Sequence, residues 1–337
     1  MSRLAGAVEF ADRRQIPIYL VALAFGAVVG LVAPGASPGF EHAIEPVLAL
    51  LLWATFRQVP FTALAAALRG GRFLAVLLVV NFVVVPVVVF GLTRFIADDQ
   101  PVLVAVLLVL LTPCIDYVIV FSGLAGASST KLLAASPLLM IGQLLLLPVY
   151  LLIFVGSDLA SVFDPGPFLH AFVVLIVIPL AAALLTEILA KHHRVGAQIT
   201  TALTSLMVAL LAATLFVVVA SQVPQVKDNL AAVAKVVPIF AGFAVITAAV
   251  GWAATRSTGL PPADGRAVLF SGTTRNSLVV LPLALALPAA FAIAPAVVVT
   301  QTLVELIVMV VFVRLVPRLL PTTDPDPVRE PVPVEQP

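Results

Sequence analysis

Residues 101–124 read PVLVAVLLVLLTPCIDYVIVFSGL, an apolar run that is interrupted in its middle by the polar residues between Thr112 and Asp116. An unpaired backbone group is costly in hydrocarbon, so an interrupted helix at membrane depth is tolerated only where it lines a cavity or is enclosed by protein. The interruption contains Cys114, the only cysteine of the chain. This stretch therefore predicts a substrate or ion site within a membrane-spanning region.

The composition predicts an all-α polytopic membrane protein. Of the 337 residues, 62% are hydrophobic and 10% are charged, and the mean hydropathy is +1.18, far outside the range of soluble globular proteins. No glycine-rich phosphate loop ending in Lys-Ser/Thr occurs, which argues against an ATP-driven pump. The sequence suggests no metal site, cofactor or nucleic-acid partner, and His192 and His193 are explained as part of a solvated basic loop.

Ten stretches are long and apolar enough to cross a bilayer, which takes about 20 residues. The second is the weakest, because Arg57, Gln58 and Pro60 lie within it and can end it early. The ten predicted spans are approximately 16–33, 43–68, 73–97, 101–124, 132–155, 167–190, 197–221, 229–254, 265–289 and 293–317.

Most of the 18 basic residues lie on one side of this topology. Positive charge is retained on the cytoplasmic side, so we expect both termini in the cytoplasm and the protein in the plasma (inner) membrane, which requires an even number of spans. The residues on this side are Arg3, Arg13, Arg14, Arg57, Arg69, Arg72, Lys131, Lys191, Arg194, Arg256, Arg266, Arg314, Arg318 and Arg329. The proline-rich tail at 321–337 lacks periodicity and is predicted to be disordered.

A second interruption, at Ser271–Ser277, falls in the ninth span. A shift of about 161–162 residues lays the first interruption over the second, and Gln143 over Glu305. Two copies of five spans enter the membrane in opposite orientations, and paired broken helices are typical of secondary transporters with inverted repeats. We therefore expect two five-helix repeats, at 1–155 and 156–320, with discontinuous fourth and ninth helices that cross.

Three charged residues lie within predicted spans: Asp116, Arg275 and Glu305. A charge at a helix centre costs about 2.5–3.5 kcal/mol on insertion scales, which indicates a use. Asp116 and Arg275 can neutralise each other as a structural or gating pair between the two interruptions. Glu305 has no basic partner on its own helix, so it is the first candidate for a proton carrier, with Asp116 as the second.

Polar residues at the interruptions are candidate ligands for a solute. Cys114 can be a small buried hydrophobe, or a thiol that selects soft partners such as trivalent arsenic or antimony. The hydroxyl and amide groups either satisfy the backbone freed by the interruptions or ligate a solute or cation. We predict a substrate site of Cys114, Thr112, Asn276 and Ser277; Thr273, Thr274 and Gln143 lie nearby.

Residues 111–154, LTPCIDYVIVFSGLAGASSTKLLAASPLLMIGQLLLLPVYLLIF, and the tenth-span sequence TLVELIV resemble the ten-helix arsenical-resistance permeases, within the superfamily of bile acid:sodium symporters. The resemblance implies two inverted repeats arranged as a panel and a core, and export of arsenite, sometimes antimonite, in exchange for protons. By position, the essential cysteine and glutamate of that family match Cys114 and Glu305.

The chain departs from that family at both interruptions. Pro113 stands where the family has an arginine, and Thr274-Arg275-Asn276-Ser277 matches only one of two expected asparagines. The leading hypothesis is a divergent proton-coupled arsenite exporter. The alternative is a sodium-coupled importer of an organic anion, with Arg275 holding the anion and Asp116 with nearby hydroxyls binding sodium. A receptor or scaffold without transport leaves the buried charges without a purpose.

Overall fold

The computed structural model describes residues 14–58, 71–115, 117–156 and 173–321 of the chain. The secondary structure of these ranges is helical, as the composition predicts. In chain order the main helices are α2 (Gln15–Val32), α3 (Ser37–Gln58), α5 (Gly71–Val79), α6 (Val85–Thr93), α7 (Gln100–Leu110), α8 (Tyr117–Leu124), α9 (Ser129–Val155), α12 (Ile178–His192), α13 (Arg194–Asp228), α14 (Leu230–Thr258), α15 (Pro262–Thr273), α16 (Ser277–Leu285) and α17 (Ala294–Leu319). Short π-helical turns, η3 (Val80–Val84) and η5 (Val173–Val177), continue directly into α6 and α12.

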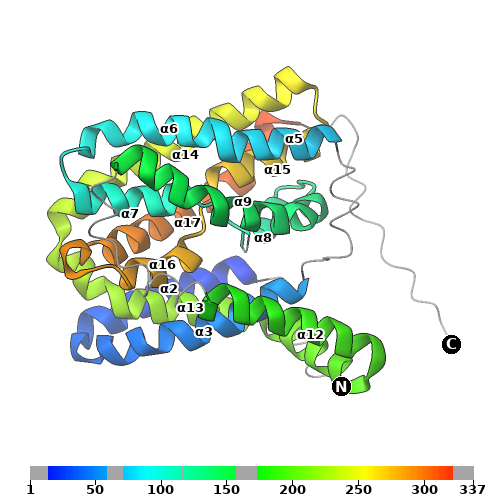
Figure 1. Cartoon of the computed structure of the whole chain (residues 1–337), viewed down its shortest axis with the longest axis horizontal. Coiled ribbons are helices and arrows are strands. Elements are labelled where there is room, and N and C mark those ends of the chain that lie inside the picture. The colour runs from blue at the N-terminus through cyan, green and yellow to red at the C-terminus, as the bar shows by residue number, and fades with distance from the viewer. Residues whose placement is uncertain (1–13, 59–70, 116, 157–172, 322–337) are drawn as a thin grey trace.

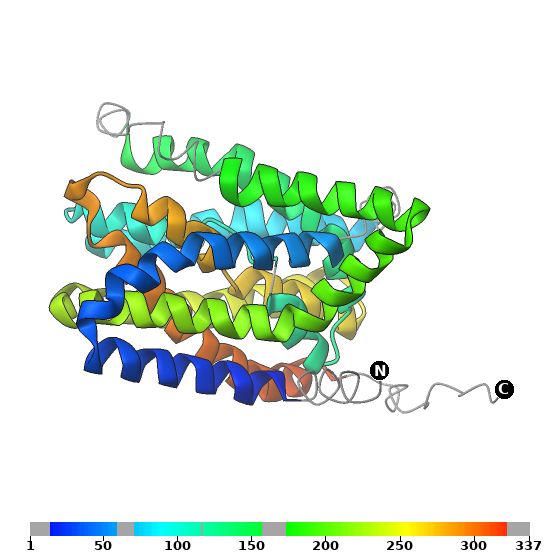
Figure 2. The ribbon, with the colours of Figure 1, turned by 90° about the horizontal axis from the view of Figure 1, so that it is seen from below.

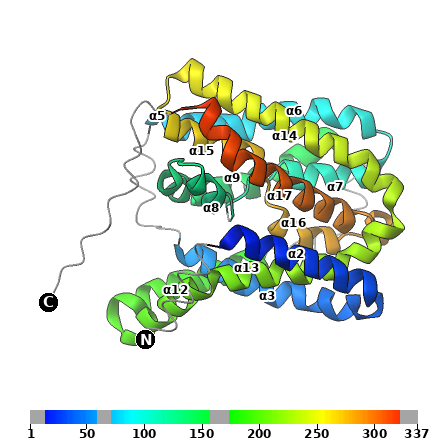
Figure 3. The same ribbon diagram turned by 180° about the vertical axis from the view of Figure 1, so that it is seen from behind.

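The helices form two groups. One group, which we call the panel, consists of α2, α3, α12 and α13, with α13 between α2 and α3 (Figures 1 and 2). The second group, which we call the core, holds α5 to α9 and α14 to α17; α17 packs between α14 and α16 (Figure 3). This division agrees with the panel and core that the resemblance implies.

Large apolar side chains cover much of the outer surface, as expected of a protein whose outer face contacts lipid. A soluble monomer rarely leaves such side chains exposed in contiguous patches. Strongly exposed examples from both groups of helices are Val21, Phe25, Val87, Phe95, Leu145, Ile153, Val245 and Ile307. Together with the long apolar helices, this surface identifies a multi-pass membrane protein.

Each of the ten predicted spans overlaps a helical segment, but only some segments are long enough to cross a bilayer on their own. Within the described residues, five helical stretches meet a length and hydropathy criterion: Gly71–Ile96, Ser129–Val155, Arg194–Pro224, Leu230–Thr258 and Ala289–Leu319. The α2 and α3 helices meet it only together, and they are bent by 104° where they join. The ten-span topology and the inverted orientation of the repeats therefore stay predictions.

The fourth and ninth predicted spans fall short because each is divided into two half-helices. The 11 residues of α7 rise by about 16 Å, roughly half of the 30 Å hydrocarbon core. After α7 the chain leaves the helix at Leu111, directly before Thr112-Pro113; proline lacks an N–H and disfavours helical geometry in the residue before it. The two predicted interruptions are thus present, and their described residues are buried.

The second interruption contains no proline and is shorter than predicted. The sequence placed it at Ser271–Ser277, whereas α15 continues to Thr273 and α16 begins at Ser277. Thr273 and Thr274 donate their hydroxyl protons to the carbonyl oxygens of Leu269 and Phe270, one helical turn back. Such bonds compete with the helical backbone pattern, and Thr274 itself is extended, with φ −88° and ψ 139°.

Two glycines allow α2 and α13 of the panel to approach closely. A Cβ atom added to Gly26 would lie 2.8 Å from the carbonyl oxygen of Phe216, and one added to Gly30 would lie 2.8 Å from that of Ala220. Both contacts are with backbone, which cannot move aside cheaply. Small residues four apart are a common device for close helix packing in membranes, so this spacing fixes how α2 lies on α13.

Candidate transport site

The two interruptions pair with each other through backbone hydrogen bonds. The Cys114 N–H donates to the carbonyl oxygen of Thr274 over 3.2 Å, and the Asn276 N–H donates to that of Thr112 over 2.9 Å. Pro113 and Arg275 face each other between these bonds as an antiparallel bridge. Backbone groups freed from two half-helices are thereby satisfied without water. The residues of the two interruptions therefore form one structural unit, which we call the crossover.

Glu305 joins this crossover from α17. Its side chain is buried, with 4% exposed. Its Oε1 accepts a 2.6 Å hydrogen bond from the Tyr117 hydroxyl, at the start of α8, and its Oε2 accepts a 2.8 Å bond from the Arg275 backbone N–H. Gln301, one turn earlier on α17, also donates to Oε2. One carboxylate thus contacts the residues that follow the first interruption and those within the second.

The Arg275 guanidinium points away from that carboxylate. It is fully buried (0% exposed), and its Nη2 donates to Asn81 Oδ1 over 3.0 Å and to the carbonyl oxygens of Ser271 and Gly272, each over 2.7 Å. Nη1 donates to the Leu110 carbonyl over 3.4 Å, and the Phe243 ring lies 5.3 Å from the guanidinium carbon. The predicted partner, Asp116, lies outside the described residues, so an Asp116–Arg275 pair stays a prediction.

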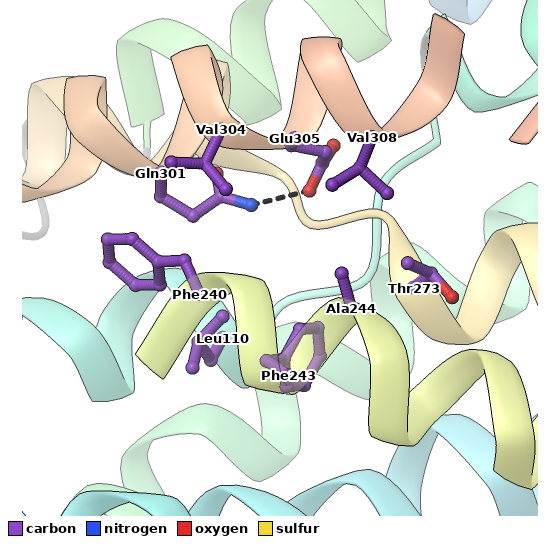
Figure 4. Close-up of a pocket in the computed structure, with 9 residues that line it drawn as sticks. All are labelled: Leu110, Phe240, Phe243, Ala244, Thr273, Gln301, Val304, Glu305 and Val308. Carbon is purple, nitrogen blue, oxygen red and sulfur yellow. Dashed lines mark hydrogen bonds between the residues drawn. The ribbon is translucent and has the colours of Figure 1, made fainter. Parts of the chain in front are cut away.

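A small pocket lies between α14 and α17, beside Glu305 (Figure 4). Its accessible volume is about 10 Å³, which is room for about one water molecule. Its walls are mostly apolar, and the polar groups are Thr273, Gln301 and Glu305. The lining residues are Leu110, Phe240, Phe243, Ala244, Thr273, Gln301, Val304, Glu305 and Val308. The pocket places an ionisable group beside this space, and a solute larger than water would need the pocket to widen.

The four predicted substrate ligands lie in the crossover rather than among the residues that line this pocket. Cys114 is fully buried, with 0% exposed, and Thr112, Asn276 and Ser277 are also buried. The Thr112 hydroxyl donates to the carbonyl oxygens of Leu108 and Val109. It thus satisfies backbone groups at the end of α7, one of the two roles that the sequence left open for these hydroxyls. The side-chain amide of Asn276 has no hydrogen-bond partner in the described part of the chain, so it has capacity for a ligand.

Three residues of the site were missed from sequence: Asn81, Tyr117 and Gln301. Asn81 lies in the π-helical turn η3 and donates to the Leu77 carbonyl and the Ser271 hydroxyl. The π-helical turns within α-helices often mark functional sites, but they are not visible in an apolar sequence. An amide at position 81 of a valine-rich run, and a tyrosine directly after Asp116, were the available signals.

Gln143, which the repeat aligns with Glu305, lies on α9 and is buried at 3% exposed. Its Oε1 has no hydrogen-bond partner within the described ranges. It does not line the pocket beside Glu305. The two aligned positions thus carry buried polar groups, but the structure brings only Glu305 into hydrogen-bond contact with the crossover.

Two crossed, interrupted helices within a core of apolar helices, with a buried carboxylate at their crossing, define the class of secondary transporters built around a discontinuous-helix site. A family model, sodium bile acid symporter family, matches residues 45–229, more than half of the chain. The chain therefore belongs to the sodium bile acid symporter family, whose members are transporters rather than enzymes. No curated protein matches the chain in sequence.

The family match includes the first interruption and ends before the second. Arg275 and Glu305 both lie beyond residue 229. Membership thus establishes that the chain is a transporter of this superfamily. Members of the family move small organic or inorganic anions together with coupling ions. The second interruption, where the sequence departs from the arsenical-resistance permeases, therefore lies outside the matched region. Its residues bear on which solute and which ion this chain uses.

Proposed function

We propose that this protein exports arsenite, or the chemically similar antimonite, across the plasma membrane in exchange for protons. The observation that carries the proposal is the position of Glu305, a buried carboxylate that lines the pocket and is hydrogen-bonded to Arg275 in the crossover and to Tyr117, the first residue of α8. The proposed orientation, with both termini in the cytoplasm, follows from the distribution of basic residues.

Protonation of Glu305 changes the crossover directly. As a carboxylate it accepts bonds from the Tyr117 hydroxyl, the Arg275 N–H and the Gln301 amide. Adding a proton makes one of these oxygens a hydroxyl that donates a bond of its own, so at least one of the three bonds is weakened or reversed in direction. A proton taken up at Glu305 therefore weakens contacts that hold the half-helices in place, which is the physical requirement for coupling protonation to a change of access. Asp116 is the second candidate for this role.

Export of arsenite requires such a coupling group. Arsenous acid is neutral at pH 7, so a carrier that binds it alone only equilibrates its concentrations across the membrane. Net expulsion needs a second site whose occupancy depends on an ion gradient, and a ligand can shift a conformational equilibrium only through its different affinities for the two states. Glu305 provides that second site for protons.

Cys114 supplies the soft ligand for arsenic in this proposal. Its thiol can exchange with one As–OH group: a sulfur–arsenic bond forms, an arsenic–oxygen bond breaks, and the thiol proton leaves with the hydroxide as water. Hydrolysis reverses the exchange and releases arsenous acid. The thiol is fully buried in the crossover, so binding requires a state in which the crossover is open. The unpartnered amide of Asn276, with Thr112 and Ser277, belongs to the same backbone-paired crossover as Cys114 and would hold the remaining hydroxyls.

The sole thiol allows a clean test of this assignment. We expect Cys114→Ser to abolish arsenite resistance in cells that lack other exporters, because a hydroxyl does not replace a thiolate as a ligand for a soft centre. The measurement is growth in arsenite, with membrane abundance determined for each strain. Thr93→Ser, at a buried hydroxyl on α6 remote from the crossover, is the control. Full resistance in the Cys114→Ser strain at normal abundance would contradict the role of the thiol.

The second candidate is a sodium-coupled symporter of an organic anion, which the name of the matched family favours. In that case Arg275 would bind the anion. The geometry weighs against this assignment, because the guanidinium is bound to four protein oxygen atoms and does not line the pocket. Sodium-dependent uptake of an organic anion, without movement of arsenite, would decide for this candidate.

A further inference from the structure

The guanidinium of Arg275 is held by the kind of ligand set that usually holds a metal cation. Its four acceptors are Asn81 Oδ1 and the carbonyl oxygens of Leu110, Ser271 and Gly272, at 3.0, 3.4, 2.7 and 2.7 Å. They come from three separate helical segments, η3, α7 and α15. Three backbone carbonyls and one amide oxygen form a neutral, all-oxygen set, which is typical of sites for hard cations.

The position of these oxygens also favours positive charge. Leu110 is the last residue of α7, and Ser271 and Gly272 lie in the last turn of α15. Carbonyl groups at a helix C-terminus have no partner within the helix and carry the negative end of the helix dipole. In transporters with discontinuous helices, such half-helix ends coordinate the coupling sodium ion. Here the C-terminal ends of α7 and α15 direct carbonyl oxygens to one position, and the Arg275 guanidinium occupies it.

We infer that Arg275 is a tethered cation that takes the place of a coupling sodium ion at the crossover. The family name implies sodium, but a sodium ion does not fit among these oxygens while the guanidinium is bound to them. The Phe243 ring, which also lines the pocket, lies 5.3 Å from the guanidinium carbon, and Arg275 itself is not among the residues that line the pocket. The positive charge is therefore a permanent part of the fold, and it leaves Glu305 as the group that exchanges an ion with solution.

This inference deepens the proposed function, because it explains why the coupling ion would be a proton rather than sodium. Its test needs no arsenite, so the result is independent of whether the arsenite assignment is correct. The purified full-length protein is heated in choline chloride and in sodium chloride of equal ionic strength, and the unfolding midpoint is measured in each. The wild-type protein should show no sodium-specific shift.

Removal of the tethered charge should create a sodium site. We expect Arg275→Ala to unfold at a lower temperature than the wild type in choline chloride, because four oxygens lose their donor. Sodium should raise its midpoint by at least about 2 °C, since a ligand that binds only the native state stabilises it. Low millimolar guanidinium chloride should do the same by filling the vacated position.

Two further variants make the result specific to this ligand set. Arg275→Lys keeps a cation in place and should show no sodium shift. Adding Asn81→Ala to Arg275→Ala removes one of the four oxygens and should abolish the sodium shift. Because loss of a buried arginine can prevent folding, Arg275→Gln is measured in parallel and should respond to sodium as Arg275→Ala does.

Either of two results would overturn the inference. One is a sodium-specific shift of the wild-type protein, which would show a sodium site that coexists with Arg275. The other is the absence of any response to sodium and to guanidinium in the folded Arg275→Ala or Arg275→Gln protein.

Discussion

At the scale of single residues, Glu305 and Arg275 divide two electrostatic tasks at the crossover. Arg275 uses its side chain to neutralise half-helix ends, and offers only its backbone N–H to Glu305. Among the described residues, the carboxylate meets Arg275 through this backbone N–H rather than through the guanidinium. A carboxylate held by neutral donors and one tyrosine hydroxyl is easier to discharge than one locked in an ion pair.

The Tyr117 hydroxyl donates the hydrogen bond to this carboxylate that we expect to tune its coupling role. Tyr117→Phe removes the 2.6 Å bond to Glu305 and keeps the ring, which packs edge-on against Phe121. A hydrogen bond to a charged group is worth about 1.5–3 kcal/mol, and its loss disfavours the charged form. We expect the pH dependence of transport to move about one to two units toward higher pH.

The measurement for this variant is the initial transport rate across a pH series, with Tyr150→Phe as the matched control. Tyr150 donates its hydroxyl to the Phe82 carbonyl, away from Glu305. An unchanged midpoint in Tyr117→Phe, or an equal shift in both variants, would show that the Tyr117–Glu305 bond does not tune the coupling group.

The sequence predicted charged residues of the site better than neutral ones. Glu305 and Arg275 were identified because a charge in a span is costly and therefore conspicuous. Asn81, Tyr117 and Gln301 were missed because a neutral amide or phenol in an apolar run carries no such signal. Their importance comes from contacts across η3, α8 and α17, which no spacing along one segment reveals.

At the scale of helices, the two interruptions were predicted for different physical reasons. Pro113 ends α7 by a local effect, so the first interruption could be placed closely from sequence. The second was placed by its run of small polar residues, and its true extent is shorter because Thr273 and Thr274 keep bonding to the helix before them. The interruptions pair through their backbones only in the folded protein. The repeat could suggest this pairing from sequence but could not establish it.

The contact of α2 with α13 gives a prediction for panel stability. Gly26→Ala places a methyl group against the Phe216 carbonyl at 2.8 Å, and overpacking of this kind costs about 1–3 kcal/mol. We expect a lower unfolding midpoint in detergent. Gly91→Ala on α6 is the control, because nothing lies within 4 Å of the added carbon; alanine there should be neutral or stabilise by about 0.5–1 kcal/mol. Equal midpoints for the two variants would show that the close approach carries no energetic weight.

At the scale of the whole molecule, the membrane class and the helical architecture followed from composition and hydropathy, because a bilayer allows few solutions for a chain this apolar. The contacts among the described helices divide them into panel and core, and the two interruptions pair through their backbones; that they belong to two crossed spans of an inverted repeat stays a prediction. The number of spans is less directly visible, since half-helices and the 104° bend between α2 and α3 leave several segments too short to cross a bilayer on their own.

Proton coupling through Glu305 is the central claim, and transport in inverted membrane vesicles tests it most directly. With an acidic interior and no sodium, wild-type vesicles should accumulate arsenite above the external concentration. Glu305→Gln replaces the carboxylate by a neutral amide of nearly the same shape. The account predicts that this variant still exchanges arsenite down its gradient but does not accumulate it. Accumulation by Glu305→Gln at the wild-type rate and to the wild-type level would contradict the account.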